Sequence, residues 1–199
     1  MRRRLAVLSL AGVAAAISGC TGTSETGDVA SGLAATSKPT TSLEAPAQNP
    51  PVSGPRMTFD PCLDVTNGFL QQAGLSEAKI KRWDFIGEPT SMLGCDYTTA
   101  EKTIMIRTGN DTYENQLVTD GALRHVKNTD LIKINGREGF IGPNRLGDED
   151  CTAFLRTDYG YVVVNGGYRL STNEVQRRGL DVCGEILRIS TLIEPLLPR

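Results

Sequence analysis

The sequence contains few of the residues and motifs that most hydrolases and nucleotide-binding enzymes need. It has one histidine, His125, in 199 residues. It has no G-x-S-x-G, H-E-x-x-H or phosphate-binding glycine loop. His125 lies in a polar stretch beside Arg124 and Lys127, which favours a surface residue over an acid–base catalyst. Enzyme classes that are recognised by these motifs are therefore excluded.

The apolar run at the start of the chain is too short to span a bilayer. Leu5–Ile17 would reach about 20 Å as a helix, against a hydrocarbon core of about 30 Å. Preceded by Arg2–Arg4, it is typical of a signal peptide. Ile17-Ser18-Gly19-Cys20 resembles the bacterial lipobox. That resemblance implies cleavage before Cys20 and a diacylglyceryl group on its sulfur, with residues 1–19 as a lipoprotein signal peptide.

Residues 20–56 lack aromatic side chains and consist mostly of Ser, Thr, Gly, Ala and Pro. Such a segment buries too little apolar surface to fold, so we expect a disordered tether with a reach of roughly 33 Å. Residues 57–199 have the usual size of one domain. We expect a monomeric, extracytoplasmic domain held at the cell membrane by the lipid, with no cofactor.

The mature chain is acidic. Removing Arg2–Arg4 from 21 basic residues leaves 18 against 23 acidic residues, a net charge of about −5. This charge argues against nucleic acid as a partner.

Five cysteines are an odd number for an exported protein, and lipid on Cys20 leaves an even set. The other four, Cys62, Cys95, Cys151 and Cys183, predict two disulfides, for which three pairings exist. Cys62 and Cys183 lie at predicted helix starts, whereas Cys95 and Cys151 lie in strand-like runs. The pairing Cys62–Cys183 with Cys95–Cys151 is therefore favoured, and the other two stay open. The wide spacing of these cysteines argues against zinc or any other metal.

Three hairpins are predicted from turn signals between strand-like runs. They join Cys95–Thr98 to Thr103–Arg107, Leu131–Ile134 to Arg137–Ile141 around Asn135-Gly136, and Cys151–Arg156 to Tyr161–Val164. The sequence therefore predicts an antiparallel sheet.

Helices are predicted at both ends of this domain. Asp60 and Pro61 suit the start of a helix that Gly74 would stop. A short helix is expected over Thr112–Val118. Ser171 and Glu174 have capping-box spacing and begin a long helical pattern. This pattern has an apolar stripe of Val182, Ile186, Ile189, Ile193 and Leu196. The expected fold class is α+β: an antiparallel sheet with the N-terminal and C-terminal helices on one face.

A series of short motifs occurs in a fixed order: Cys20, Phe59-Asp60-Pro61-Cys62, Gly94-Cys95-Asp96-Tyr97, Cys151 and Asp181-Val182-Cys183. The chain thus resembles the actinobacterial lipoprotein family known as domain of unknown function 3558. The family more often has tryptophan where Tyr97 stands, and we expect Tyr97 in the core. The resemblance implies an envelope location and no catalytic residue.

Three patterns have both a chemical and a structural interpretation. Ser76–Lys79 matches S-x-x-K, but the chain lacks S-D-N and K-T-G, which favours a capped helical turn. Asp148–Asp150 with Asn144 lacks the ligand spacing of a calcium loop, which favours a solvated acidic loop. Trp83 and Phe85, beside Lys81, form either part of the core or an exposed patch for a glycan or partner, and core packing is favoured.

Two functions are compatible with these residues. The favoured one is a non-enzymatic module that binds an envelope ligand or partner. The alternative is a hydrolase or transferase acting on cell-wall glycans through two carboxylates, such as Glu138 and a second acid across a hairpin. Two acids facing each other across a cleft would indicate the enzyme, and an apolar groove would indicate the binding module.

Overall fold

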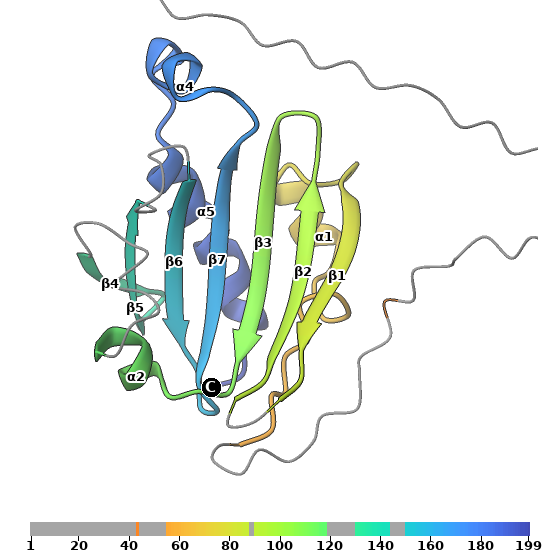
Figure 1. The fold of residues 1–199 in the computed structure, drawn as a ribbon, viewed down its shortest axis with the longest axis vertical. Helices are drawn as coiled ribbons and strands as arrows, with labels where there is room; N and C mark the ends of the chain where they lie inside the picture. The colour runs from red at the N-terminus through yellow and green to blue at the C-terminus, as the bar shows by residue number, and fades with distance from the viewer. Residues whose placement is uncertain (1–42, 44–54, 88–89, 119–129, 144–149) are drawn as a thin grey trace, which may run out of the picture. The chain divides into compact units, whose positions relative to one another are not determined.

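Seven strands form one antiparallel sheet in the order β1-β2-β3-β7-β6-β5-β4 (Figure 1). The computed structural model describes residue 43 and residues 55–87, 90–118, 130–143 and 150–199. The strands are β1 Lys79–Phe85, β2 Met92–Thr98, β3 Lys102–Gly109, β4 Asp130–Ile134, β5 Arg137–Pro143, β6 Asp150–Arg156 and β7 Tyr161–Tyr168.

The sheet consists of two meanders joined at their inner edges. Strands β1–β3 form one and β4–β7 the other, and β3 pairs with β7 so that Ile106 lies opposite Val164. All three predicted hairpins are confirmed. In the β4–β5 turn, Asn135 and Gly136 have φ angles of 50° and 88°, which is why an Asn-Gly pair suits this position.

Helices pack on both faces of this sheet. The helices are α1 Asn67–Gln72, α2 Tyr113–Val118, α4 Thr172–Arg178 and α5 Val182–Ile193, and α5 is followed by a 3₁₀ turn at Glu194–Leu196. Figure 1 shows α1 and α5 behind the sheet. The main core lies on that side, where Ile186, Ile189 and Ile193 of α5 are buried as the apolar stripe predicts. The protein is thus a seven-stranded antiparallel sheet with helices and two disulfides.

The predicted start of the first helix, at Asp60, is wrong. Residues 61–64 form a turn, and α1 begins only at Asn67, where the hydroxyl of Thr66 accepts from the N–H of Phe69. In a continuous helix, the Pro61 carbonyl would accept a hydrogen bond from the N–H four residues later. It accepts one from the buried Tyr97 hydroxyl instead. The predicted stop is confirmed, because Gly74 has a φ of 67°.

The long C-terminal helical pattern forms two helices. Ser171 caps α4 by accepting from the N–H of Glu174, as the capping-box spacing predicts. Gly179 then adopts φ 61° and ends α4, and Asp181 caps α5 by accepting from the N–H of Gly184. A left-handed glycine followed by a new capping residue breaks the pattern.

The predicted disulfide pairing is wrong. The bonds are Cys62–Cys95 and Cys151–Cys183, with Cα–Cα distances of 5.2 and 5.1 Å. Cys95 on β2 and Cys151 on β6 are separated by β3 and β7, three strand spacings or about 14 Å, which no disulfide spans. Each bond instead joins a segment of the covering layer to the strand beneath it.

Candidate functional site

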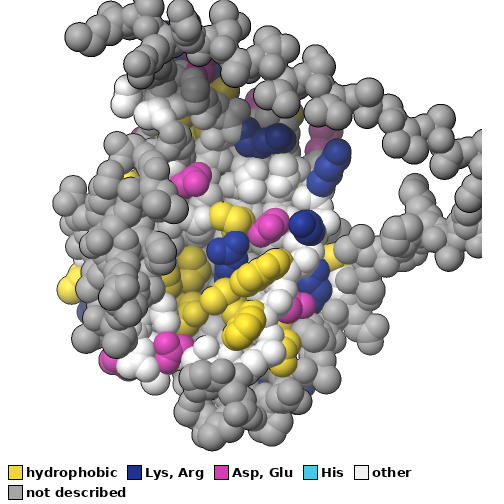
Figure 2. Space-filling model, in the orientation of Figure 1, with side chains coloured by type: hydrophobic (Ala, Val, Ile, Leu, Met, Phe, Trp, Pro, Cys, Tyr) yellow, Lys and Arg dark blue, Asp and Glu magenta, His cyan; other side chains and the backbone are white. Residues whose placement is uncertain are grey.

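The face of the sheet opposite α5 carries a row of side chains that crosses all seven strands. Strand pairing places them side by side in the order Trp83, Gly94, Arg107, Val163, Phe154, Phe140 and Leu131. Figure 2 shows this face, with hydrophobic side chains gathered near its centre and basic and acidic ones directly beside them. Trp83 and Leu131, at the ends of the row, are both exposed, whereas Phe154 and Phe140 between them are buried.

The end on β5 and β6 is packed beneath α2. Phe140 and Phe154 stack with ring centroids 4.5 Å apart, and Tyr113 of α2 lies 5.8 Å from Phe140. Tyr161 completes this aromatic cluster, 5.7 Å from Phe154. Burial and the charge of the nearby Asp111 together raise the pKa of Tyr161 to about 12, although the charge of Arg107 opposes them. The cluster is a second, small core that fixes α2 on the sheet.

The end on β1 is exposed. Trp83 is 46% exposed and Phe85 is 53% exposed, so the prediction that these aromatics pack in the core is wrong. Both residues lie on strand β1, where alternate side chains point to opposite faces of the sheet. Arg82 and Asp84 take the helix-covered side, and the aromatic residues between and after them take the open side.

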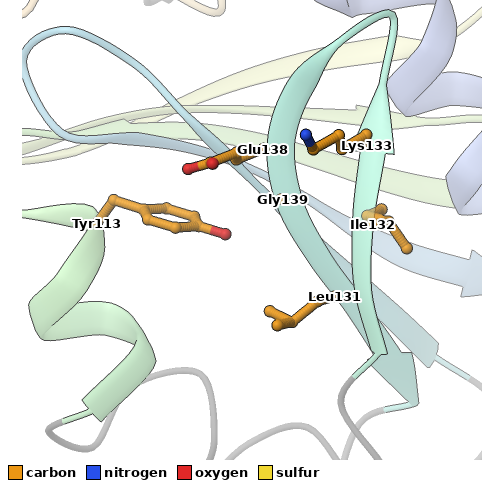
Figure 3. A pocket seen from close by; sticks show the side chains of 6 residues that line it. All are labelled: Tyr113, Leu131, Ile132, Lys133, Glu138 and Gly139. Carbon is orange, nitrogen blue, oxygen red and sulfur yellow. The ribbon is translucent and has the colours of Figure 1, made fainter.

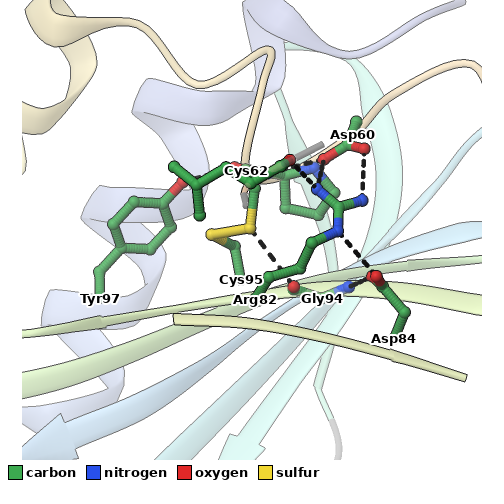
Figure 4. The surroundings of a disulfide bond; sticks show 9 residues. Asp60, Cys62, Arg82, Asp84, Gly94, Cys95 and Tyr97 are labelled. Carbon is green, nitrogen blue, oxygen red and sulfur yellow. Dashed lines mark hydrogen bonds and ion pairs between the residues drawn. A yellow bond between two sulfur atoms is a disulfide. The ribbon is translucent and has the colours of Figure 1, made fainter. Parts of the chain in front are cut away.

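A buried ion network holds β1 in this orientation. Arg82 contacts the carboxylate of Asp60 at 2.6 Å and that of Asp84 at 2.7 Å, and its side chain is only 7% exposed (Figure 4). Burial lowers the pKa of Arg82, but hydrogen bonds to both carboxylates raise it more, so the guanidinium stays charged. The network lies beside the Cys62–Cys95 disulfide. Together they anchor an edge strand whose aromatic side chains face outward.

Gly94 lets Trp83 approach the sheet closely. A Cβ at this position would lie 2.5 Å from the Trp83 carbonyl oxygen and 3.2 Å from Cε3 of its ring. Beyond Gly94, the guanidinium of Arg107 stacks on the indole, with its carbon 5.2 Å from the ring centroid. The indole thus has a fixed position and an exposed surface.

Polar groups surround this indole. Lys79 and Lys81 are exposed on the same side of β1, and no ion pair joins either to another described residue. Asp96 lies directly opposite Lys81 on β2. Within the described part of the chain, Asp96 Oδ1 and Arg107 Nε are buried and have no hydrogen-bond partner. We call the group formed by Lys79, Lys81, Trp83, Phe85, Asp96 and Arg107 the Trp83 platform.

A cleft of about 350 Å³ opens at the other end of the same face (Figure 3). Its lining includes Tyr113, Leu131, Ile132, Lys133, Glu138 and Gly139. Figure 3 shows the Tyr113 ring of α2 projecting toward β5, beside the Glu138 carboxylate. Burial and the charge of Glu138 raise the pKa of Tyr113 to about 12, so its hydroxyl is a neutral hydrogen-bond donor. The cleft combines the apolar side chains of Leu131 and Ile132 with two charged ones, Lys133 and Glu138.

The second carboxylate that the enzyme hypothesis requires does not lie across the β4–β5 hairpin from Glu138. The residue opposite Glu138 across the β4–β5 hairpin is Lys133, not an acid. Arg156 binds both Glu138, at 3.1 Å, and Glu114 of α2, at 2.6 Å, and all three side chains are about half exposed. The two carboxylates are therefore bridged by one arginine at an exposed position.

The other sequence candidates do not form a site in the described structure. Ser76 lies in a turn and Lys79 begins β1, so the predicted capped helical turn is wrong and the S-x-x-K pattern does not lie on a helix. Asp150 begins β6. His125, Asn144, Asp148, Glu149 and Cys20 lie outside the described residues, as do residues 1–19 and most of the tether.

The described residues contain neither a metal site nor a membrane-spanning helix. No group of histidine, cysteine or acidic side chains in that part of the chain could hold a metal ion. No helix among those residues is long and apolar enough to cross a membrane.

Asp96 and Arg107 were not predicted from the sequence as site residues. The motif around Cys95 contains Asp96, but its face depends on the strand register, and Arg107 appears only as the end of a strand-like run. The one available signal was alternation. Because Cys95 and Ile106 are apolar and opposite each other, their neighbours Asp96 and Arg107 must share the opposite face.

The sequence matches the family described as protein of unknown function (DUF3558) over residues 15–196. No curated protein and no solved structure matches it. The match spans nearly the whole chain and agrees with the order of motifs around its cysteines. The chain therefore belongs to the DUF3558 family.

Proposed function

We propose that this protein is a lipid-anchored, extracytoplasmic binding module and that the Trp83 platform is its ligand-binding surface. One observation carries the proposal: the only tryptophan of the chain lies exposed on a sheet face, stacked on Arg107, while a buried ion network holds its strand from behind. Exposed aromatic and arginine side chains are the residues most enriched at binding hot spots.

Rigidity supports this assignment. An aromatic side chain that is already ordered loses little conformational entropy when a ligand covers it. The Trp83 ring contacts Gly94 beneath it and Arg107 beside it, so its orientation is set before binding. A binding surface gains from such order, whereas an exposed aromatic residue with no ligand has only an unfavourable contact with water.

The location is inferred from the amino terminus. We propose that residues 1–19 are removed, that Cys20 carries lipid, and that residues 20–56 hold the domain away from the outer surface of the cell membrane. Two acyl chains give stable anchoring at about 0.8 kcal/mol for each buried methylene group. A tether of this composition would let the platform reach structures beyond the lipid headgroups.

Site-specific photo-crosslinking in intact cells tests the proposal. A photoreactive phenylalanine analogue at Phe85 places the probe on the platform, and the same analogue at Leu187 places it on an exposed position of α5, behind the sheet. We expect adducts of higher mass from position 85 and few from position 187. Equal yields from both positions would argue against the platform as the binding surface.

The enzyme alternative has its own test. If the protein cleaves wall glycans through Glu138, purified wall material is turned over by the native protein and not by Glu138→Gln. We expect no turnover by either. Turnover that this substitution abolishes would replace the binding proposal.

A further inference from the structure

We infer that the Trp83 platform binds an acidic polysaccharide, a chain of sugar rings that carries carboxylate or phosphate groups. This inference rests on the proposed function, because it names the ligand class of the same surface. Three features of the platform lead to it: the exposed indole, the local charge and the linear arrangement of side chains.

The indole suits the apolar side of a sugar ring. Sugar C–H bonds carry partial positive charge and pack on the negatively polarised face of an aromatic ring. Gly94 keeps the strand beside Trp83 free of a side chain, so the ring lies against the sheet and keeps an exposed surface. Tryptophan offers the largest such surface of any side chain.

The charge of the platform is opposite to that of the protein. Lys79, Lys81 and Arg107 outnumber the one acid, Asp96, whereas the mature chain has a net charge of about −5, from 18 basic and 23 acidic residues. A local excess of cations attracts an anionic ligand and steers it to this face. The charge complementarity therefore favours a glycan with acidic groups over a neutral one.

Asp96 favours a sugar over an anionic lipid surface. Its carboxylate lies between Lys81 on β1 and Met105 on β3, and its Oδ1 atom lacks a hydrogen-bond partner among the described residues, as does Arg107 Nε. A polar atom left unpaired in this way costs about 1–3 kcal/mol. Sugar hydroxyls both donate and accept, so small side-chain shifts would let them pair with both groups. The phosphate group of a lipid supplies only acceptors, so it cannot pair with the carboxylate.

The arrangement of side chains indicates a chain and not a single ring. Lys79, Lys81, Trp83 and Phe85 are alternate residues of β1 and share its open face. Alternate residues of a strand are about 6.6 Å apart, so the row extends for about 20 Å. An elongated ligand contacts the whole row, whereas one sugar ring contacts only its centre.

Trp83 itself reports binding, because it is the only tryptophan. The full chain in detergent is titrated with a hexamer of galacturonic acid and, in parallel, with a hexamer of glucose, while tryptophan emission and acrylamide quenching are recorded. We expect the acidic hexamer to change the emission, to protect Trp83 from quenching and to bind at least tenfold more tightly. Its affinity should fall as salt is added, since screening weakens exposed charge pairs.

A matched pair of variants tests the charge argument. Lys81→Gln removes a cation from the platform, and Lys133→Gln removes an exposed lysine from the far end of the same face. We expect about a two- to fivefold loss of affinity for the acidic hexamer at low salt from the first variant and none from the second. Both side chains are exposed, so thermal unfolding should stay unchanged.

Three results would overturn the inference: no protection of Trp83 by either hexamer, equal binding of both, or tighter binding to phosphatidylglycerol vesicles than to the acidic hexamer. Adducts with a protein at position 85, without any oligosaccharide binding, would overturn it and leave the proposed function intact. Equal crosslinking yields from positions 85 and 187 would argue against both this inference and the proposed function.

Discussion

Trp83 and Arg107 stack on the open face of the sheet across Gly94, the residue of β2 that strand pairing places between them. The stack needs a strand with no side chain at that one position. It also needs β1 to keep its register, because a slip of one residue would move Trp83 to the helix-covered face. The candidate binding surface therefore depends on a glycine and on the network behind β1.

Gly94→Ala should weaken both the fold and the stack. The new Cβ would lie 2.5 Å from a backbone oxygen of β1, so the edge strand must move. We expect a loss of about 2 kcal/mol in the free energy of unfolding and a red shift of tryptophan emission. Gly68→Ala in α1 is the control, since its nearest neighbouring atom is 3.8 Å away and alanine favours a helix. Equal effects of the two substitutions on denaturant unfolding would contradict this account.

Arg82→Met should be among the most destabilising substitutions in the chain. It leaves the carboxylates of Asp60 and Asp84 without their cation, next to a buried disulfide. Removing one partner of a buried ion pair costs about 3–5 kcal/mol. Arg177→Met breaks an exposed ion pair with Glu174 on α4 and should cost at most about 1 kcal/mol. Chemical denaturation of both variants measures the difference.

The disulfide pattern is tested by peptide mapping without reduction. We expect linked peptides for Cys62–Cys95 and Cys151–Cys183 and no reaction of these four cysteines with a thiol reagent in denaturant. Replacing Cys62 and Cys95 together by serine should cost about 4 kcal/mol, because the bond closes a loop with a sequence separation of 33 residues. A linked Cys95–Cys151 peptide would refute the described sheet order.

Glu185 should make stability depend on pH. Burial raises its pKa, but hydrogen bonds from Arg188 and Lys102 and the charges of both lower it more, so its pKa in the folded protein is below 4.5. The lowered pKa stabilises the fold above about pH 4.5, and this contribution is lost as pH falls through the folded-state pKa. The native protein should therefore exceed Glu185→Gln in stability at pH 7, and the gap should shrink below pH 4.5. A constant gap in thermal unfolding between pH 7 and pH 3 would contradict the assignment.

Cys20→Ala should release the protein from the membrane. Under the proposed anchoring, the variant has no thiol to which lipid could be attached. We expect the native protein to partition into detergent with the added mass of lipid and the variant to stay in the aqueous phase. Ser18→Ala keeps a small residue before the cleavage site and should behave as the native protein.

Several local structures followed from short-range chemistry in the sequence, although the helix start at Asp60 did not. Asn135-Gly136 determined a tight turn because both residues tolerate positive φ, and the apolar stripe of α5 determined which side of that helix is buried. The spacing of Ser171 and Glu174 determined the start of α4. The order of motifs around the cysteines was enough to identify the family.

Tertiary structure decided what depends on distant partners. The pairing of β3 with β7 placed two strands between Cys95 and Cys151 and so directed each cysteine to the layer above it. Alternation along β1 left two possible faces for Trp83, and the open one goes with the contact of Arg82 to Asp60, 22 residues away, on the covered side. Strand register is set by such long-range contacts, and this is why the sequence alone could not decide whether Trp83 belongs to the core or to the binding surface.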